Sequence, residues 1–173
     1  MKTVLFILTL FLSSLFSDKL TNQEAERIFN NCAKNGNLYE GTLLVTGKIP
    51  DYFFTPSDLE IYKKLEKDSL ITIETSNDYF VINISDKGKE FISKKVIPVE
   101  ENINAIEVKL FYYKFDKIIE IQEIPYNNTA RVVVNIKKEK ETPFIILKDK
   151  EFLDTFQKSF LYRKTNNGWK LCD

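Results

Sequence analysis

The chain has 173 residues, carries 25 basic and 25 acidic side chains, and contains no histidine. The balanced charge leaves no field of one sign to attract nucleic acid, and the missing histidine excludes Ser-His-Asp and Cys-His nucleophiles and histidine zinc sites. Because two cysteines cannot form a four-thiolate site, the sequence predicts no metal and no other cofactor. Only carboxylate, lysine or tyrosine acid–base chemistry and calcium binding by clustered oxygens stay possible, and no calcium-loop motif is present.

Residues 1–17 have the layout of a secretory signal. Met1 and Lys2 form a short positive region, an apolar run follows, and Asp18 ends that run well before the roughly 20 residues that a membrane-spanning helix needs. The sequence therefore predicts cleavage after Ser17, a periplasmic or secreted protein, and no stable membrane span after cleavage. An uncleaved signal anchor is the alternative.

The first helix is predicted after Thr21, which stands three residues before Glu24 as in a capping box. Its apolar residues recur with helical spacing and are Ala25, Ile28, Phe29, Cys32 and Ala33. Asn35-Gly36 is a typical helix end. Cys32 is therefore expected to point into the core.

The next segment contains Leu43-Leu44-Val45, which predicts a short strand, and then the aromatic tripeptide Tyr52, Phe53 and Phe54. Three consecutive aromatic side chains can form an exposed interaction surface. The same side chains can also fill the space between two subdomains, and the sequence favours this second interpretation.

A second helix is predicted from Pro56, after the capping residue Thr55, to about Lys67. Two strands follow at residues 70–75 and 79–84 and predict a hairpin. A short helix is expected at residues 85–93, and Pro98 marks a boundary.

Two stretches of this half, residues 62–71 and residues 79–89, resemble the helix, the wing hairpin and the following helix start of winged-helix domains. The resemblance covers roughly residues 20–95. It implies a helical subdomain with a β-hairpin, and in that family the segment often binds DNA. The segment at residues 56–68 departs from the family because its acidic residues outnumber its lysines, so we expect a scaffold or a protein contact and no nucleic-acid partner.

The second half alternates apolar and polar residues in several stretches and predicts an antiparallel sheet of four or five strands. The clearest strand contains Ala130, Val132, Val134 and Ile136. The run Gly168-Trp169-Lys170-Leu171 predicts a terminal hairpin and resembles a late strand of cystatin-like and NTF2-like domains. Those families include both enzymes and accessory modules, so the resemblance does not choose between the two.

Cys32 and Cys172 are predicted to form a disulfide, because export places both thiols in an oxidising compartment and two cysteines allow one intramolecular pairing. Two unpaired thiols are the alternative. The bond requires Cα atoms within about 7 Å of each other.

Taken together, these patterns predict an α+β protein with a winged-helix-like subdomain at residues 18–98 and an antiparallel β-sheet subdomain at residues 99–173. The expected function is that of an exported, non-enzymatic module that contacts another protein or an envelope component. The alternative is a small-ligand carrier or a small NTF2-like enzyme that uses the concave face of the sheet. That alternative requires a cavity with paired carboxylates or a tyrosine–carboxylate pair of perturbed pKa.

Overall fold

The computed structural model describes residues 19–148 and 153–172. The predicted signal segment, residues 1–17, therefore lies outside the described residues. The helical elements of the described part are α1 (Asn22–Lys34), α2 (Pro56–Lys67), α3 (Asp86–Lys89) and the short 3-10 turns η1 (Asp51–Phe53), η2 (Pro125–Asn127) and η3 (Pro143–Leu147).

One antiparallel sheet of eight strands organises the described residues. The strands are β1 (Tyr39–Pro50), β2 (Ile71–Thr75), β3 (Tyr79–Ile84), β4 (Ile92–Glu100), β5 (Ile103–Ile124), β6 (Thr129–Glu141), β7 (Thr155–Thr165) and β8 (Gly168–Lys170). Their order is β2-β3-β1-β5-β6-β7-β8, and β4 pairs with β5 beside this path.

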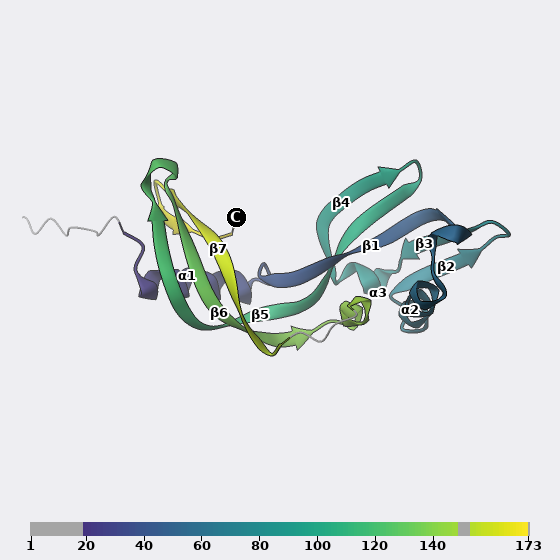
Figure 1. The fold of residues 1–173 in the computed structure, drawn as a ribbon, viewed down its shortest axis with the longest axis horizontal. Helices are drawn as coiled ribbons and strands as arrows, with labels where there is room; N and C mark the ends of the chain where they lie inside the picture. The colour runs from purple at the N-terminus through teal and green to yellow at the C-terminus, as the bar shows by residue number, and fades with distance from the viewer. Residues whose placement is uncertain (1–18, 149–152, 173) are drawn as a thin grey trace, which may run out of the picture.

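The long strand β5 holds the two halves of the sheet together. Its first part, from Ile103 to Tyr112, pairs with β1, and residues Ile103 to Val108 also pair with β4. Its second part, from Phe111 to Ile124, pairs with β6. In Figure 1 this strand runs from the β4–β5 hairpin to the curved end of the sheet that carries α1.

Helix α1 packs against the face of the sheet formed by the second part of β5 with β6 and β7 (Figure 1). The Phe29 ring lies 5.6 Å from the Phe115 ring and 5.2 Å from the Phe160 ring, measured between centroids. The hydroxyl of Tyr162 donates a hydrogen bond of 2.9 Å to the carbonyl of Ala25. Aromatic side chains therefore fill the space between the helix and the sheet, and the buried tyrosine has a partner for its polar end.

Local signals place the first two predicted helices and the hairpin correctly. The Thr21 side chain accepts the Glu24 amide, and Thr55 forms a full capping box with Asp58 in front of α2. Strands β2 and β3 form the expected antiparallel pair, with Ile71 opposite Ile84.

The predicted fold class is wrong. An N-terminal helical, winged-helix-like part followed by four or five strands is not what forms, because the N-terminal half supplies β1 to β4 to the common sheet. Strand β1 has 12 residues where a strand of three was expected. Two glycines and the polar Thr46 interrupt the apolar–polar alternation of β1. Thr46 is nevertheless buried, and its hydroxyl donates a hydrogen bond to the carbonyl of Asn104.

Strand β4 is a second difference from the sequence prediction, which has a helix at residues 85–93 and a boundary at Pro98. Helix α3 ends at Lys89, and the chain then pairs with β5. A proline is tolerated at this position since, among the described residues, β4 pairs on one side alone. The boundary predicted after residue 98 falls within β4, and the division into two subdomains stays a prediction.

Candidate functional site

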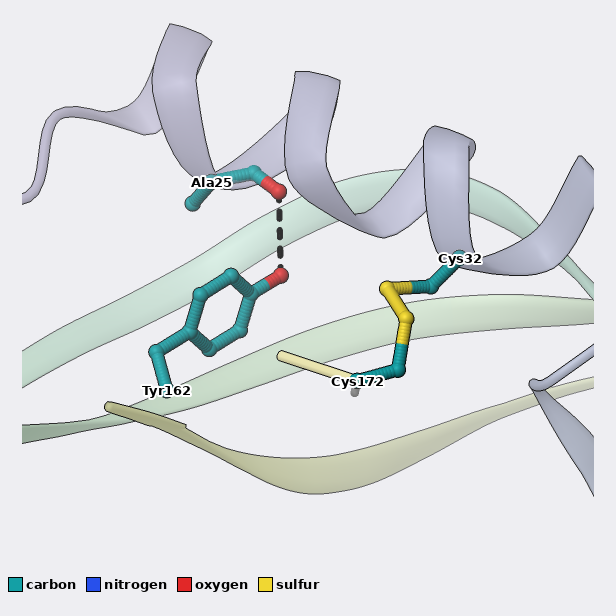
Figure 2. Close-up of a disulfide and its surroundings, with 4 residues drawn as sticks. All are labelled: Ala25, Cys32, Tyr162 and Cys172. Carbon is teal, nitrogen blue, oxygen red and sulfur yellow. Dashed lines mark hydrogen bonds between the residues drawn. A yellow bond between two sulfur atoms is a disulfide. The ribbon is translucent and has the colours of Figure 1, made fainter. Parts of the chain in front are cut away.

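Cys32 and Cys172 are bonded, and their Cα atoms lie 6.1 Å apart across a sequence separation of 140 residues. Figure 2 shows the bond reaching from α1 to the chain end, beside the hydrogen bond between Tyr162 and Ala25. Cys172 lies two residues after Lys170, the last residue of β8, so strand alternation does not constrain its direction. The predicted pairing therefore has the geometry that it requires, and its role is structural.

The structure divides the aromatic tripeptide between two environments. Tyr52 is 85 % exposed and Phe53 is 49 % exposed. Phe54 instead packs edge-on against Tyr62, at 4.9 Å between ring centroids, and against Phe80 at 5.7 Å. Phe54 is therefore a packing residue between α2 and β3, whereas Tyr52 and Phe53 face solvent, and a role of the tripeptide as an interaction surface stays a prediction.

A hollow of about 290 Å³ lies beside this tripeptide, between β1 and α2. It is lined by Leu43, Val45, Phe53, Phe54, Asp58, Ile61, Tyr62 and Leu147. We call this hollow the aromatic groove. Leu43 of β1 is 51 % exposed at the edge of the groove, and Phe53 of η1 is also exposed. Apolar surface from these two elements is therefore in contact with solvent at the same place.

Tyr62 closes one side of the groove through its hydroxyl. The Tyr62 Oη accepts a hydrogen bond of 3.1 Å from the amide of Val45 and donates one of 3.0 Å to the carbonyl of the same residue. Burial raises the Tyr62 pKa to about 12, so the hydroxyl keeps its proton at neutral pH. The two bonds show that the Val45 peptide groups face α2 and not a neighbouring strand.

In the part of the chain that the structure describes, β1 is unpaired along the edge beside the groove. β1 pairs with β5 from Tyr39 to Gly47, but with β3 it pairs only from Gly47 to Pro50. Within residues 19–148 and 153–172, no strand pairs with the other edge of residues 39–46.

A second cluster, which the sequence did not predict, joins Glu40, Tyr113 and Lys158. The Lys158 ammonium lies 2.7 Å from the Glu40 carboxylate and also donates to the Tyr113 hydroxyl, which in turn donates to Glu40. Glu40 and Lys158 are 118 residues apart, and nothing in the local pattern of either strand indicates that they meet.

The shifts of the Glu40 and Tyr113 pKa values fit an ion pair between Lys158 and Glu40, and they do not fit a pair of groups that exchange a proton. Burial raises the Tyr113 pKa, and its bond to Glu40 raises it further. Burial opposes ionisation of Glu40, but hydrogen bonds from Lys158 and Tyr113 outweigh it and lower the Glu40 pKa. At neutral pH the phenol stays protonated and the carboxylate stays charged, so neither group is poised to exchange a proton.

In the described part of the chain, no group of three or more His, Cys, Asp or Glu side chains is placed to hold a metal ion. Among the same residues, no helix combines the length and the apolar character needed to cross a membrane.

Comparisons with protein-family models, with curated proteins and with solved structures found no match to this chain. The winged-helix-like and cystatin-like or NTF2-like resemblances of the sequence are neither supported nor opposed by them.

Proposed function

We propose that this protein is an exported, non-enzymatic binding module that contacts a partner protein through the aromatic groove. The observation that carries the proposal is a hollow of about 290 Å³, lined mainly by apolar side chains, whose lining residues Leu43 and Phe53 are half exposed to solvent. Exposed apolar surface next to a concavity is typical of a site that another molecule covers.

The energetics favour an apolar anchor from the partner. Burying one large aliphatic or aromatic side chain in such a hollow contributes about 1.5–3 kcal/mol, before the costs of association. Phe53, which lines the hollow, would cover that anchor with aromatic area whose immobilisation costs little conformational entropy, because an aromatic side chain has only two rotatable angles.

The bonded pair Cys32–Cys172 supports the exported localisation, because disulfides persist in oxidising compartments outside the cytoplasm. The alternative of an enzyme or ligand carrier has weaker support. Its expected tyrosine–carboxylate pair occurs at Tyr113 and Glu40, but the pKa directions hold that pair in one protonation state.

The test is a selection of peptides from a displayed library of random dodecapeptides on the immobilised, disulfide-bonded protein. Two variants give matched controls, because Phe53 in the groove and Leu161 on β7 are both 49 % exposed. We expect the selected peptides to bind Phe53→Glu at least about tenfold more weakly than the wild type, and Leu161→Glu with unchanged affinity, since about 1.4 kcal/mol corresponds to a factor of ten.

Equal loss in both variants, or no enrichment of any peptide over a blank surface, would contradict the proposal. Circular dichroism of both variants, compared with the wild type, checks that neither substitution has unfolded the protein.

A further inference from the structure

The direction of the Val45 peptide groups determines which groups of β1 face the groove. In a strand, successive residues direct their N–H and C=O groups to opposite edges, so residues two apart share an edge. Val45 directs both groups toward Tyr62. Leu43 and Gly41 therefore direct theirs toward the same open edge, before the register shift between Glu40 and Gly41.

The Tyr62 hydroxyl does at Val45 what a neighbouring strand would do. It donates to the carbonyl and accepts from the amide, and these are the two bonds that a paired residue exchanges across an antiparallel ladder. A side chain therefore satisfies the backbone N–H and C=O groups of Val45 at this edge. The corresponding groups of Leu43 and Gly41 are available to another partner. An unpaired row of this kind is a template for strand addition.

We propose that the partner of the aromatic groove binds as an extended strand, antiparallel or parallel to β1, over residues 41–43. This inference rests on the proposed function and names the conformation and chemistry of the bound segment. A helical segment would fill the hollow but leave the Leu43 and Gly41 peptide groups without partners, whereas an extended segment satisfies both.

The charge at the groove specifies a second feature of the segment. Asp58 lines the hollow, and hydrogen bonds from the side chain and backbone of Thr55 lower its pKa, so it is ionised at neutral pH. Residues two apart on a strand lie on the same face. The segment should therefore carry an apolar residue for the hollow and a lysine or arginine two positions away, opposite Asp58.

The backbone contact is tested with a peptide taken from the library selection. Methylation of its backbone nitrogens, one at a time, should weaken binding at least about tenfold at alternate positions and leave the positions between them unchanged, because only every second amide of an added strand faces β1. The wild-type protein is used throughout, so the readout does not depend on the folding of a variant.

A matched pair of variants tests the same contact from the protein side. Leu43→Ala keeps the amide and removes the side chain, whereas Leu43→Pro also removes the outward amide while sparing the ladder with β5. We expect Leu43→Pro to bind the peptide at least about tenfold more weakly than Leu43→Ala.

The outcomes separate the inference from the proposed function. A peptide that depends on Phe53 but tolerates methylation at every position would overturn strand addition and leave the groove as the binding site. A protein that sediments as a dimer, and that Leu43→Pro converts to a monomer, would also overturn the inference, because the edge would then pair with a second copy of this chain. Selected peptides that lack a basic residue two positions from the apolar one would contradict the role assigned to Asp58.

Discussion

Removing the disulfide should cost this protein a large part of its stability. The bond links α1 to the chain end across 140 residues, which is nearly the whole described chain. In the chain-entropy model, closing a loop of about 140 residues lowers the entropy of the unfolded state by an amount worth about 5 kcal/mol at 25 °C, and measured values are commonly 2–4 kcal/mol. Folded domains are stable by only about 5–15 kcal/mol, so this one bond is a substantial fraction.

The cleanest perturbation is Cys172→Ala, because Cys172 is half-buried whereas Cys32 is 4 % exposed in the core. Urea unfolding followed by circular dichroism should give a free energy of unfolding about 2–5 kcal/mol lower for Cys172→Ala than for the wild type. Cys32→Ala should lose the same amount plus a smaller packing term. The wild type unfolded in the presence of a phosphine reductant should approach the value of Cys172→Ala.

A loss of less than about 1 kcal/mol in Cys172→Ala, for a wild type that contains the bond, would contradict the entropic role of the disulfide. Thiol titration of the unfolded, non-reduced wild type shows whether the wild type contains the disulfide. Two free thiols in that titration would instead show that the bond is absent in solution.

Three further predictions concern single side chains. Lys158→Met should lower the free energy of unfolding by about 1–2 kcal/mol at pH 7, a value reduced by the partial exposure of Lys158, and the loss should shrink as Glu40 is protonated below its usual pKa of 4.5. The stability that the Tyr62 phenol contributes is complete below pH 10.0 and is lost as the pH rises toward about 12. The unfolded state releases this proton first, so Tyr62→Phe should flatten the alkaline fall in stability by up to about 1.4 kcal/mol per pH unit. Gly47→Ala places a Cβ 2.0 Å from the carbonyl oxygen of Asn102 at φ +99° and should cost more than about 2 kcal/mol in urea unfolding. Gly168→Ala, at φ +96° with open space, should cost about 1 kcal/mol, and equal losses at both glycines would contradict the argument from the clash.

Patterns within about ten residues of sequence identify several elements without any tertiary information. Thr21 and Thr55 cap the two long helices, the apolar spacing of α1 identifies its buried face, and the alternation from Ala130 to Ile136 identifies β6. The cysteine pairing followed from a count of two together with the predicted export.

The length of β1 and the groups along its edges depend instead on contacts with residues far away in the sequence. Thr46 carries no apolar signal, yet it is buried, and its hydroxyl donates a hydrogen bond to the carbonyl of Asn104, 58 residues away. Glu40 and Lys158 belong to strands that β5 and β6 separate, and their contact depends on the register of all four strands. The open edge beside the aromatic groove has the same origin, since it exists because β3 pairs with only the last four residues of β1. The partner and the register of a strand depend on residues far away in the sequence. The residues of one strand therefore do not specify its pairing without those of the other strands.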